Sequence, residues 1–467
     1  MKIYAPNIHL FTFQLYKISN LDLTKSQIDR HLIWTTGDEI VHRTLNKDLH
    51  LYQRLINVDT ESNNPRLDLL KDPIQDNYAV TFDGQISLDH QNQDLLIKGF
   101  AYPLRLHDSY GLWLNLRRPE KENNIETDDL DIAVFSKLNP HNCLIVKENP
   151  LFLGQTLLIT GWLTGAKDKK IVQQIAKECL KSIFHSYPLS SFNRQGELFG
   201  SPIFEYGLFS QIGNYQHVLI WLFADGEADT KFNQCYQELL DLWFFRTKSV
   251  KAFKDSREIY KALDLAYLEV ETILEKFPKL EDKQFRNHLN LKDLKTQLKI
   301  LPQLSLNYTR LLRNLEEYHN TIIINTNNYN ERLQQIRDLT NSDLTFLETF
   351  SQKNSPYFQQ QITADLGYFH HGSALLSQAI DSIRGIVEIE QAERDHSLGN
   401  LIQILGIGFG GGAIASGIIT QHIDKISQPI PLVSLNNPSY PVYASCFWSA
   451  IATLCFTALG WLITKCK

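Results

Sequence analysis

Two uncharged apolar stretches close the chain, and they constrain its fold more than any other feature. Residues 401–419 and 442–464 contain no Asp, Glu, Lys or Arg, and each has close to the roughly 20 residues that a helix needs to cross a bilayer. The intervening residues 421–441 hold four prolines and cannot be helical throughout. The sequence therefore predicts a transmembrane hairpin with an extended loop, and a pair of buried helices in a soluble core is the alternative.

Basic residues flank the outer ends of this hairpin. Arg384 and Arg394 precede the first stretch, and Lys465 and Lys467 follow the second, whereas the loop holds only Lys425. Lys and Arg are enriched in the cytoplasmic flanks of membrane helices. We therefore expect a multi-pass membrane protein with both termini in the cytoplasm.

Glycines recur at a spacing of four in the first stretch. Three of them spell G-x-G-x-x-G, but a dinucleotide site requires a preceding strand and a βαβ unit, which the sequence does not predict here. Small residues four apart let helices approach closely in a membrane. We interpret these glycines as helix-packing positions, against the second stretch or another copy of the chain: Gly406, Gly408, Gly410, Gly412 and Gly417.

The second stretch carries a hydroxyl at every fourth position, at Ser445, Ser449, Thr453 and Thr457. On a helix these positions share one drifting face. Hydroxyls in membrane helices often bond to their own backbone. The other interpretation is a polar surface that lines a pore or packs against a neighbouring helix.

An acidic cluster precedes the first stretch. It is typical of a solvated helix surface. In a ring of copies, the same carboxylates would form a collar that concentrates cations at a pore mouth. Its members are Glu388, Glu390, Glu393 and Asp395.

Residues 229–397 follow a helical pattern and are expected to form a bundle or stalk ahead of the hairpin, which we place at 398–464, with a short basic tail at 465–467. A helix that begins at Asp229 or Thr230 is expected to run towards Phe277. A shorter helix, Lys283–Ile300, is expected to end before Pro302.

Apolar residues then repeat at the spacing of a coiled coil, up to a break at Ser355-Pro356. A second helical run continues into the first apolar stretch without a proline. We favour an antiparallel bundle within one chain over a parallel stalk between copies. We expect the apolar residues of this repeat to form the contact seam between helices, and we call them the predicted seam. They are Leu304, Tyr308, Leu311, Leu315, Tyr318, Ile322, Tyr329, Ile336, Leu339, Phe346 and Phe350.

Residues 1–228 differ from the rest, because strand-like runs outnumber helical ones and do not alternate strictly with them. This pattern predicts an α+β domain rather than a doubly wound sheet. The expected helices are Lys25–Leu45 and Lys169–His185. The expected strands are Ile8–Tyr16, Tyr78–Phe82, Leu95–Tyr102, Gly111–Leu116, Asp131–Phe135, Cys143–Val146, Thr156–Trp162, Pro202–Leu208 and Val218–Phe223.

The chain offers no complete set of catalytic or metal-binding residues. No P-loop, G-x-S-x-G, H-E-x-x-H or kinase signature occurs, and the six cysteines form no C-x-x-C pair. Asp225 follows an apolar run, and we interpret it and its acidic neighbours as stabilising the start of the next helix. We therefore expect no catalytic residue, no metal and no cofactor. The formal charge of −6 argues against a nucleic-acid partner.

The order of these parts resembles that of the CorA-type magnesium channels: a soluble domain containing a sheet, long helices, two closing spans and a basic tail. Those channels carry Gly-Met-Asn at the end of the first span, and this chain lacks it because its sole methionine is Met1. The resemblance therefore implies a layout but transfers no functional residue. The same order also resembles membrane-tethered effectors of bacterial defence systems.

Three classes of function fit these features. The first is a non-enzymatic membrane protein whose cytoplasmic domain binds a protein or small molecule and relays this to the hairpin. The second is an oligomeric cation channel or transporter of CorA-like layout. The third, a membrane-anchored enzyme, is disfavoured because no catalytic set is complete. We expect the lipid bilayer and further copies of the chain as partners.

Overall fold

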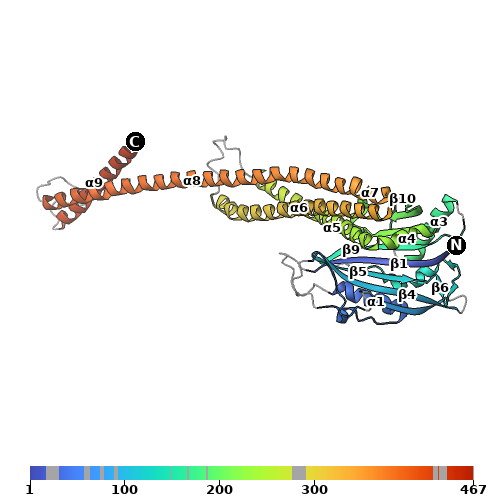
Figure 1. Cartoon of the computed structure of the whole chain (residues 1–467). Helices are drawn as coiled ribbons and strands as arrows, with labels where there is room; N and C mark the ends of the chain where they lie inside the picture. The colour runs from blue at the N-terminus through green and yellow to red at the C-terminus, as the bar shows by residue number, and fades with distance from the viewer. Residues whose placement is uncertain are drawn as a thin grey trace. The chain divides into compact units, whose positions relative to one another are not determined.

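The computed structural model describes residues 1–467 apart from 17–30, 57–63, 74–77, 89–92, 148, 166–167, 186–187, 276–290, 424–429, 431–438 and 466–467 (Figure 1). The described residues form two compact units. The N-terminal unit comprises residues 1–265 with 310–370, and the C-terminal unit comprises residues 266–309 with 371–467. The predicted fold class is confirmed, because a sheet-rich α+β part is followed by long helices and then by a two-helix apolar hairpin. The domain boundaries near 228 and 397 stay predictions.

A ten-stranded sheet forms the centre of the N-terminal unit. Its strand β1 (Lys2–Leu15) pairs with β5 on one side and β9 on the other. Strands β9 and β12 are parallel, whereas the other neighbours are antiparallel. The order is β10 (Phe192–Leu198), β11 (Ser201–Tyr206), β12 (His217–Phe223), β9 (Phe152–Trp162), β1, β5 (Ser109–Arg117), β4 (Gln93–Leu106) and β2 (Arg66–Asp68), with β3 (Val80–Leu88) beside β4 and β8 (Leu130–Asp131) beside β1.

Helices cover both faces of this sheet, which explains why β1 is buried on both sides (Figure 1). Ile8 and Leu10 belong to a core that also contains residues of α1 (Leu32–Leu45) and α3 (Lys169–Ile183). On the opposite face, Phe13 lies 5.3 Å from Phe244, ring to ring. Phe244 belongs to α5 (Tyr236–Glu275), which follows α4 (Gly226–Gln234). The sheet is therefore the middle layer of three.

Three helical segments pack together within the N-terminal unit, from α5, α6 (Leu291–Thr340) and α8 (Ser355–Gln421). The ring of Phe358 stacks on Phe253 at 4.2 Å, and Tyr329 lies 5.1 Å from Phe350. Aromatic side chains bury large areas, so these contacts supply much of the packing. The aromatic positions of the predicted seam are therefore used inside one chain.

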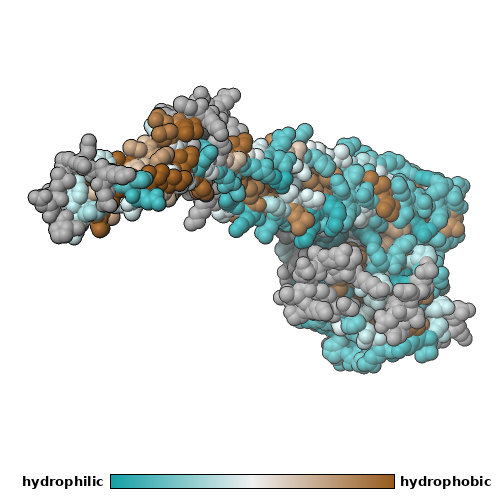
Figure 2. All heavy atoms as spheres, turned by 90° about the vertical axis from the view of Figure 1, so that its left-hand side faces the viewer, coloured by the Kyte–Doolittle hydropathy of each residue, from teal (hydrophilic) through white to brown (hydrophobic). Residues whose placement is uncertain are grey.

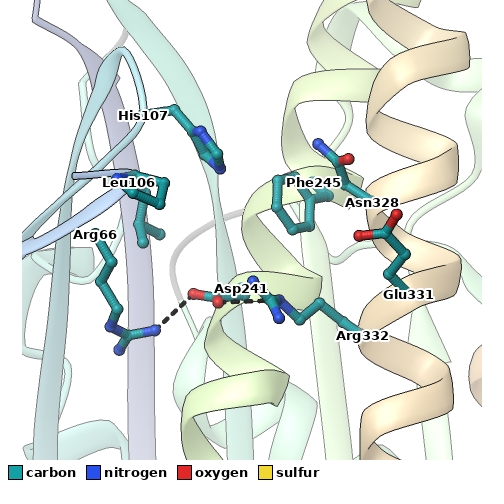
Figure 3. Close-up of a pocket in the computed structure, with 9 residues that line it drawn as sticks. Arg66, Leu106, His107, Asp241, Phe245, Asn328, Glu331 and Arg332 are labelled. Carbon is teal, nitrogen blue, oxygen red and sulfur yellow. Dashed lines mark hydrogen bonds and ion pairs between the residues drawn. The ribbon is translucent and has the colours of Figure 1, made fainter. Parts of the chain in front are cut away.

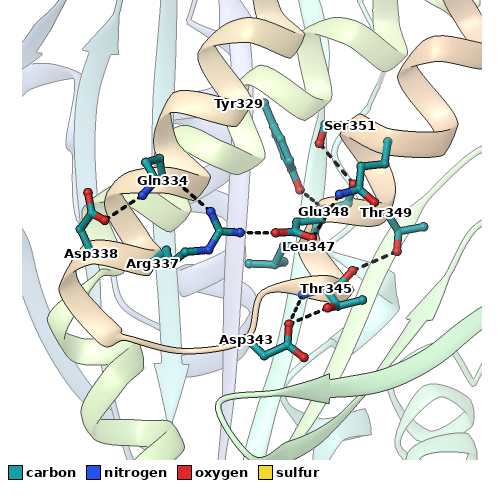
Figure 4. A network of polar contacts seen from close by, with 11 residues as sticks. Tyr329, Gln334, Arg337, Asp338, Asp343, Thr345, Leu347, Glu348, Thr349 and Ser351 are labelled. Carbon is teal, nitrogen blue, oxygen red and sulfur yellow. Dashed lines mark hydrogen bonds and ion pairs between the residues drawn. The ribbon is translucent and has the colours of Figure 1, made fainter.

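A short polar network holds the turn between α6 and α8 (Figure 4). The carboxylate of Asp343 accepts a hydrogen bond of 2.9 Å from the backbone N–H of Thr345, which begins α7 (Thr345–Thr349). Hydrogen bonds from the Thr345 side chain and backbone lower the pKa of Asp343. Arg337 of α6 pairs with Glu348, and the Tyr329 hydroxyl donates to the Leu347 carbonyl at 2.8 Å. A π-helical turn, Phe350–Asn354, then leads directly into α8, so the predicted break at Ser355-Pro356 is a helix start.

The predicted helix end before Pro302 is wrong. Helix α6 runs through Pro302, which lies on its exposed side between the buried Leu301 and Leu304. A proline inside a helix removes one backbone hydrogen bond. Water can satisfy the freed carbonyl on the exposed side, while the two leucines keep the helix packed. The structure does not describe residues 276–290, where the predicted start of this helix lies.

Two predicted strands, Asp131–Phe135 and Cys143–Val146, are also wrong. The first contains only the end of β8 and then the short helix α2 (Val134–Lys137), and the second is a turn. Their apolar side chains are buried, which gave a strand-like pattern without a strand. Strand β10 was missed, because its sequence is mostly polar. Among the predicted seam residues, Leu339 is 51% exposed.

Candidate functional site

Two helices of the C-terminal unit are long and apolar enough to cross a membrane: Leu398–Gln421, the end of α8, and Tyr440–Ile463 of α9 (Tyr440–Lys465). Only 11% of the first apolar window and 6% of the second are buried. Core helices of soluble proteins bury most of their apolar surface, so these two helices do not resemble them. Phe409, Ile414 and Leu454 are each more than two thirds exposed. Figure 2 colours apolar residues at the surface brown.

Two of the five predicted packing glycines face α9. A Cβ built on Gly408 lies 3.1 Å from the Cβ of Thr457, and one built on Gly412 lies 2.9 Å from the Cβ of Thr453. These distances leave no room for a side chain. The structure thus brings the glycine positions and the hydroxyl stripe, which the sequence analysis identified separately, into contact.

The four hydroxyls of the stripe all have partners within the hairpin. Ser449 donates to the Ser416 hydroxyl at 2.8 Å, and Ser445 lies 3.0 Å from the Thr420 hydroxyl. Thr453 and Thr457 donate to carbonyls one turn earlier in α9, at 2.9 and 2.8 Å. The stripe therefore forms polar links between α8 and α9 as well as bonds to its own backbone.

The remaining glycines lie on the other side of the helix. Among the described residues, no heavy atom other than those of the adjoining helix backbone lies within 4 Å of a Cβ built on Gly406, Gly410 or Gly417. All five glycines sit inside α8, which is helical from Ser355 to Gln421, so the G-x-G-x-x-G pattern has no strand before it.

The predicted acidic collar lies on α8 ahead of the apolar window. Glu388 and Asp395 are exposed, and the side chains of Glu390 and Glu393 lie outside the described ones. Among the described residues, no three His, Cys, Asp or Glu side chains come together as a metal site.

Asp225 has the structural role that its sequence context predicts. Its carboxylate accepts a hydrogen bond of 3.0 Å from the backbone N–H of Glu227 and thereby caps α4. Glu227 pairs with Lys231 one turn later, at 2.5 Å. A carboxylate at this position satisfies an otherwise unpaired N–H.

A small cavity in the N-terminal unit surrounds a shared carboxylate (Figure 3). Asp241 of α5 lies 2.8 Å from Arg66 of β2 and 3.1 Å from Arg332 of α6. The cavity measures about 170 Å³ and also borders His107, whose pKa is lowered by burial and by the charge of Lys248. This space suits a few water molecules rather than an organic ligand. The ion pairs join the sheet to two helices.

A second buried charge cluster centres on Glu205 of β11. Its carboxylate contacts Arg194 at 2.6 Å, Arg246 at 2.9 Å and His217 at 3.4 Å, and Arg246 also donates to the Tyr215 hydroxyl at 2.6 Å. Burial raises the pKa of Glu205, but the bond to His217 and the charges of Arg246 and Arg194 outweigh it and hold this pKa well below its usual range.

The same cluster keeps its histidine neutral. Burial and the charge of Arg246 lower the pKa of His217 to about 4. Burial also raises the pKa of Tyr215 to about 12. The cluster thus contains one carboxylate and two guanidinium groups.

Sequence analysis missed both charge clusters, since their members are far apart along the chain. One local signal was available. Glu205 lies in the strand Ser201–Tyr206, and Arg246 directly follows the buried run Leu242–Phe245. A charged residue embedded in an apolar run predicts a buried, paired charge.

The chain matches no family model and no curated protein. Among solved structures it is similar to the CorA magnesium transporter from Methanocaldococcus jannaschii. The match has 9% sequence identity and a TM-score of 0.25, and it covers 67% of this chain and 92% of the other. It agrees with the resemblance in the order of parts, and at this level it carries no argument about the site or the activity.

Proposed function

We propose that this protein is a non-enzymatic two-pass membrane protein in which α8 connects a cytoplasmic binding unit to the hairpin. The observation that carries the proposal is the continuity of α8 from Ser355 to Gln421. The first turns of α8 pack within the N-terminal unit, where Phe358 contacts Phe253, and its last 24 residues form an apolar helix of membrane-spanning length. A change at the binding unit therefore has a continuous helical route to the hairpin. Its partner is a cytoplasmic protein or a small molecule.

In this proposal, the hairpin anchors the protein and associates with further copies through Gly406, Gly410 and Gly417. The open space beside these glycines supports such contacts, because small residues permit close helix approach in lipid. The engagement of all four hydroxyls of the stripe within the hairpin favours an anchor over a pore lining.

The alternative is an oligomeric cation channel. The exposed carboxylates of Glu388 and Asp395 ahead of the first span favour it, because acidic rings concentrate cations at pore mouths. Neither span holds a charged residue within residues 401–419 or 442–464, whereas ion pathways often contain one.

Ion flux from liposomes that contain the full-length protein separates the two functions. We expect K⁺ and Mg²⁺ efflux no faster than from protein-free liposomes, because an anchor provides no polar pathway. The variant Ser449→Leu/Thr453→Val serves as the matched comparison, since it removes two hydroxyls of the stripe. Rapid efflux in the unmodified protein that disappears in this variant would establish the channel instead.

Cysteine labelling tests the proposed orientation, with both termini in the cytoplasm. In a background without Cys446, Cys455 and Cys466, Ser434→Cys should react with an impermeant maleimide added to intact cells. Lys467→Cys should react only after permeabilisation, because the basic flank stays inside. The opposite pattern would reverse the assignment, and labelling of both positions in intact cells would contradict the two-pass topology.

A further inference from the structure

A cavity of about 850 Å³ lies in the N-terminal unit between α5 and the starts of β9 and β12. Its walls come from described residues between 141 and 147, from Asn149, from residues 188–191, from the connection 207–216 between β11 and β12, and from one side of α5. This volume falls in the range of roughly 300–1,000 Å³ that is typical of sites for small molecules. It is five times as large as the cavity at Asp241, which measures about 170 Å³.

The described charged residues that line this cavity are all basic. Helix α5 contributes Arg246, Lys251 and Lys254, and Lys147 and His141 come from the loop that precedes β9. Arg246 is paired with Glu205, and Lys251 lies 2.6 Å from Asp255, and neither carboxylate lines the cavity. No Asp or Glu occurs among the described lining residues. The wall therefore favours an anionic ligand.

One polar atom at the cavity wall lacks a partner among the described residues. The side-chain oxygen of Asn142 is buried and accepts no hydrogen bond, and Asn142 lines the cavity. More than nine in ten buried polar groups in proteins have a partner. An Asn side chain presents both a carbonyl and an amide, so it can bind a hydroxyl or an amine of a ligand.

Part of the remaining lining is apolar, beside polar side chains such as Gln155, Ser191 and Gln211. Phe152, Leu208, Ile212 and Val250 border the cavity, together with Leu189, which is 48% exposed. A site for an inorganic ion alone requires no such surface. The combination of a basic wall, apolar side chains and an unpartnered side-chain oxygen fits a ligand with an anionic group, a flat or apolar body and polar substituents.

We propose that this cavity binds an organic phosphate of mononucleotide size, with the phosphate towards the basic side of α5. This inference deepens the proposed binding role of the N-terminal unit by naming its ligand class. Helix α5 also contacts the segment that leads into α8: the guanidinium carbon of Arg246 lies 5.2 Å from the Phe350 ring, and Phe253 stacks on Phe358. The ligand site thus adjoins the helix that continues into the membrane.

Calorimetric titration of the full-length protein in detergent tests this proposal, with AMP, adenosine and inorganic phosphate as probes. We expect AMP to bind at least about tenfold more tightly than either adenosine or phosphate, because only AMP uses both walls. The double variant Lys251→Gln/Lys254→Gln should weaken AMP binding by about tenfold or more, the value of a lost charge-assisted hydrogen bond. Lys261→Gln is the matched control, since Lys261 lies on the same helix, is exposed and does not line the cavity.

The inference would be overturned by no binding of AMP at millimolar concentration, by equal binding of AMP and adenosine, or by an unchanged affinity in the double variant. Equal binding of AMP and phosphate would also overturn it, because the apolar wall would then have no role. Thermal unfolding of each variant confirms that the fold is retained. These outcomes leave the membrane topology and the flux measurement untouched, so failure here is distinguishable from failure of the proposed function.

Discussion

Replacing Glu205 by Gln is expected to destabilise the N-terminal unit by about 3 kcal/mol or more, the usual effect of removing one partner from a buried ion pair. Glu205 and Arg246 are each 3% exposed, so water cannot compensate for the lost charge. Gln has nearly the same size as Glu, so this variant removes the charge without changing the packing. Two guanidinium groups would then remain beside a neutral amide.

Thermal unfolding of the full-length protein in detergent measures this effect, and a loss of that size lowers the melting temperature by roughly 5–10 °C. Glu227→Gln is the matched control, because Glu227 forms an exposed pair with Lys231 on α4. Such surface pairs contribute about 0–1 kcal/mol. Equal melting temperatures for the two variants would contradict the structural role of the Glu205 cluster.

The pH dependence provides a second measurement of the same group. The pKa of Glu205 is lower in the folded state than its ordinary value of 4.5. The stabilisation by its charge is therefore fully present above that value and is lost as the pH falls below it. We expect the difference between the unmodified protein and Glu205→Gln to shrink from pH 5 towards pH 3. A difference that is constant over this range would contradict stabilisation by the charge of Glu205.

Replacing Gly412 by Leu is expected to separate the two helices of the hairpin. The first added carbon alone would lie 2.9 Å from the Cβ and 3.0 Å from the Cα of Thr453, so the helix backbone itself must move. Overpacking of this kind costs about 1–3 kcal/mol, which lowers the equilibrium constant for packing of the two helices by roughly 5- to 150-fold. Gly410→Leu adds the same side chain two residues away, where no heavy atom lies within 4 Å.

Disulfide formation between cysteines at positions 416 and 449 reports this packing. The two serine hydroxyls lie 2.8 Å apart. In a variant without the native cysteines, Ser416→Cys and Ser449→Cys should therefore cross-link under mild oxidation in membranes. We expect Gly412→Leu to abolish most of this cross-link and Gly410→Leu to preserve it. Gly410→Leu should instead reduce the size of the oligomer in detergent. An intact cross-link in Gly412→Leu would show that α9 packs elsewhere on α8.

The predictable parts of this fold are those whose signal is local. Uncharged runs of about 20 residues identify the hairpin without any tertiary information, and the uninterrupted apolar run of β12 identifies a strand buried on both faces. Strand β10 has no such signal, since most of its residues are polar and it lies at the edge of the sheet. Local apolar patterns also misled at residues 131–135, where burial comes from a short helix and a turn.

The candidate site was predictable only as separate lists of residues. A spacing of four places Gly408 and Gly412 on one face and Thr453 and Thr457 on another, but it does not reveal that the faces meet. The basic wall of the large cavity depends on residues 147 and 246–254, which the sheet brings together. Such contacts are set by strand order, and strand order is a property of the whole domain.

The central position of β1 has a consequence for the order of events during synthesis. Strand β1 needs residues 109–117 on one side and 152–162 on the other, so it has no sheet partner until β5 has been made. Pairings this distant along the chain form slowly. The sheet is complete in sequence by Phe223, and the last segment of the N-terminal unit ends at residue 370, before the first apolar span begins at Leu398. The N-terminal unit is therefore complete in sequence before the first apolar helix of membrane-spanning length is made.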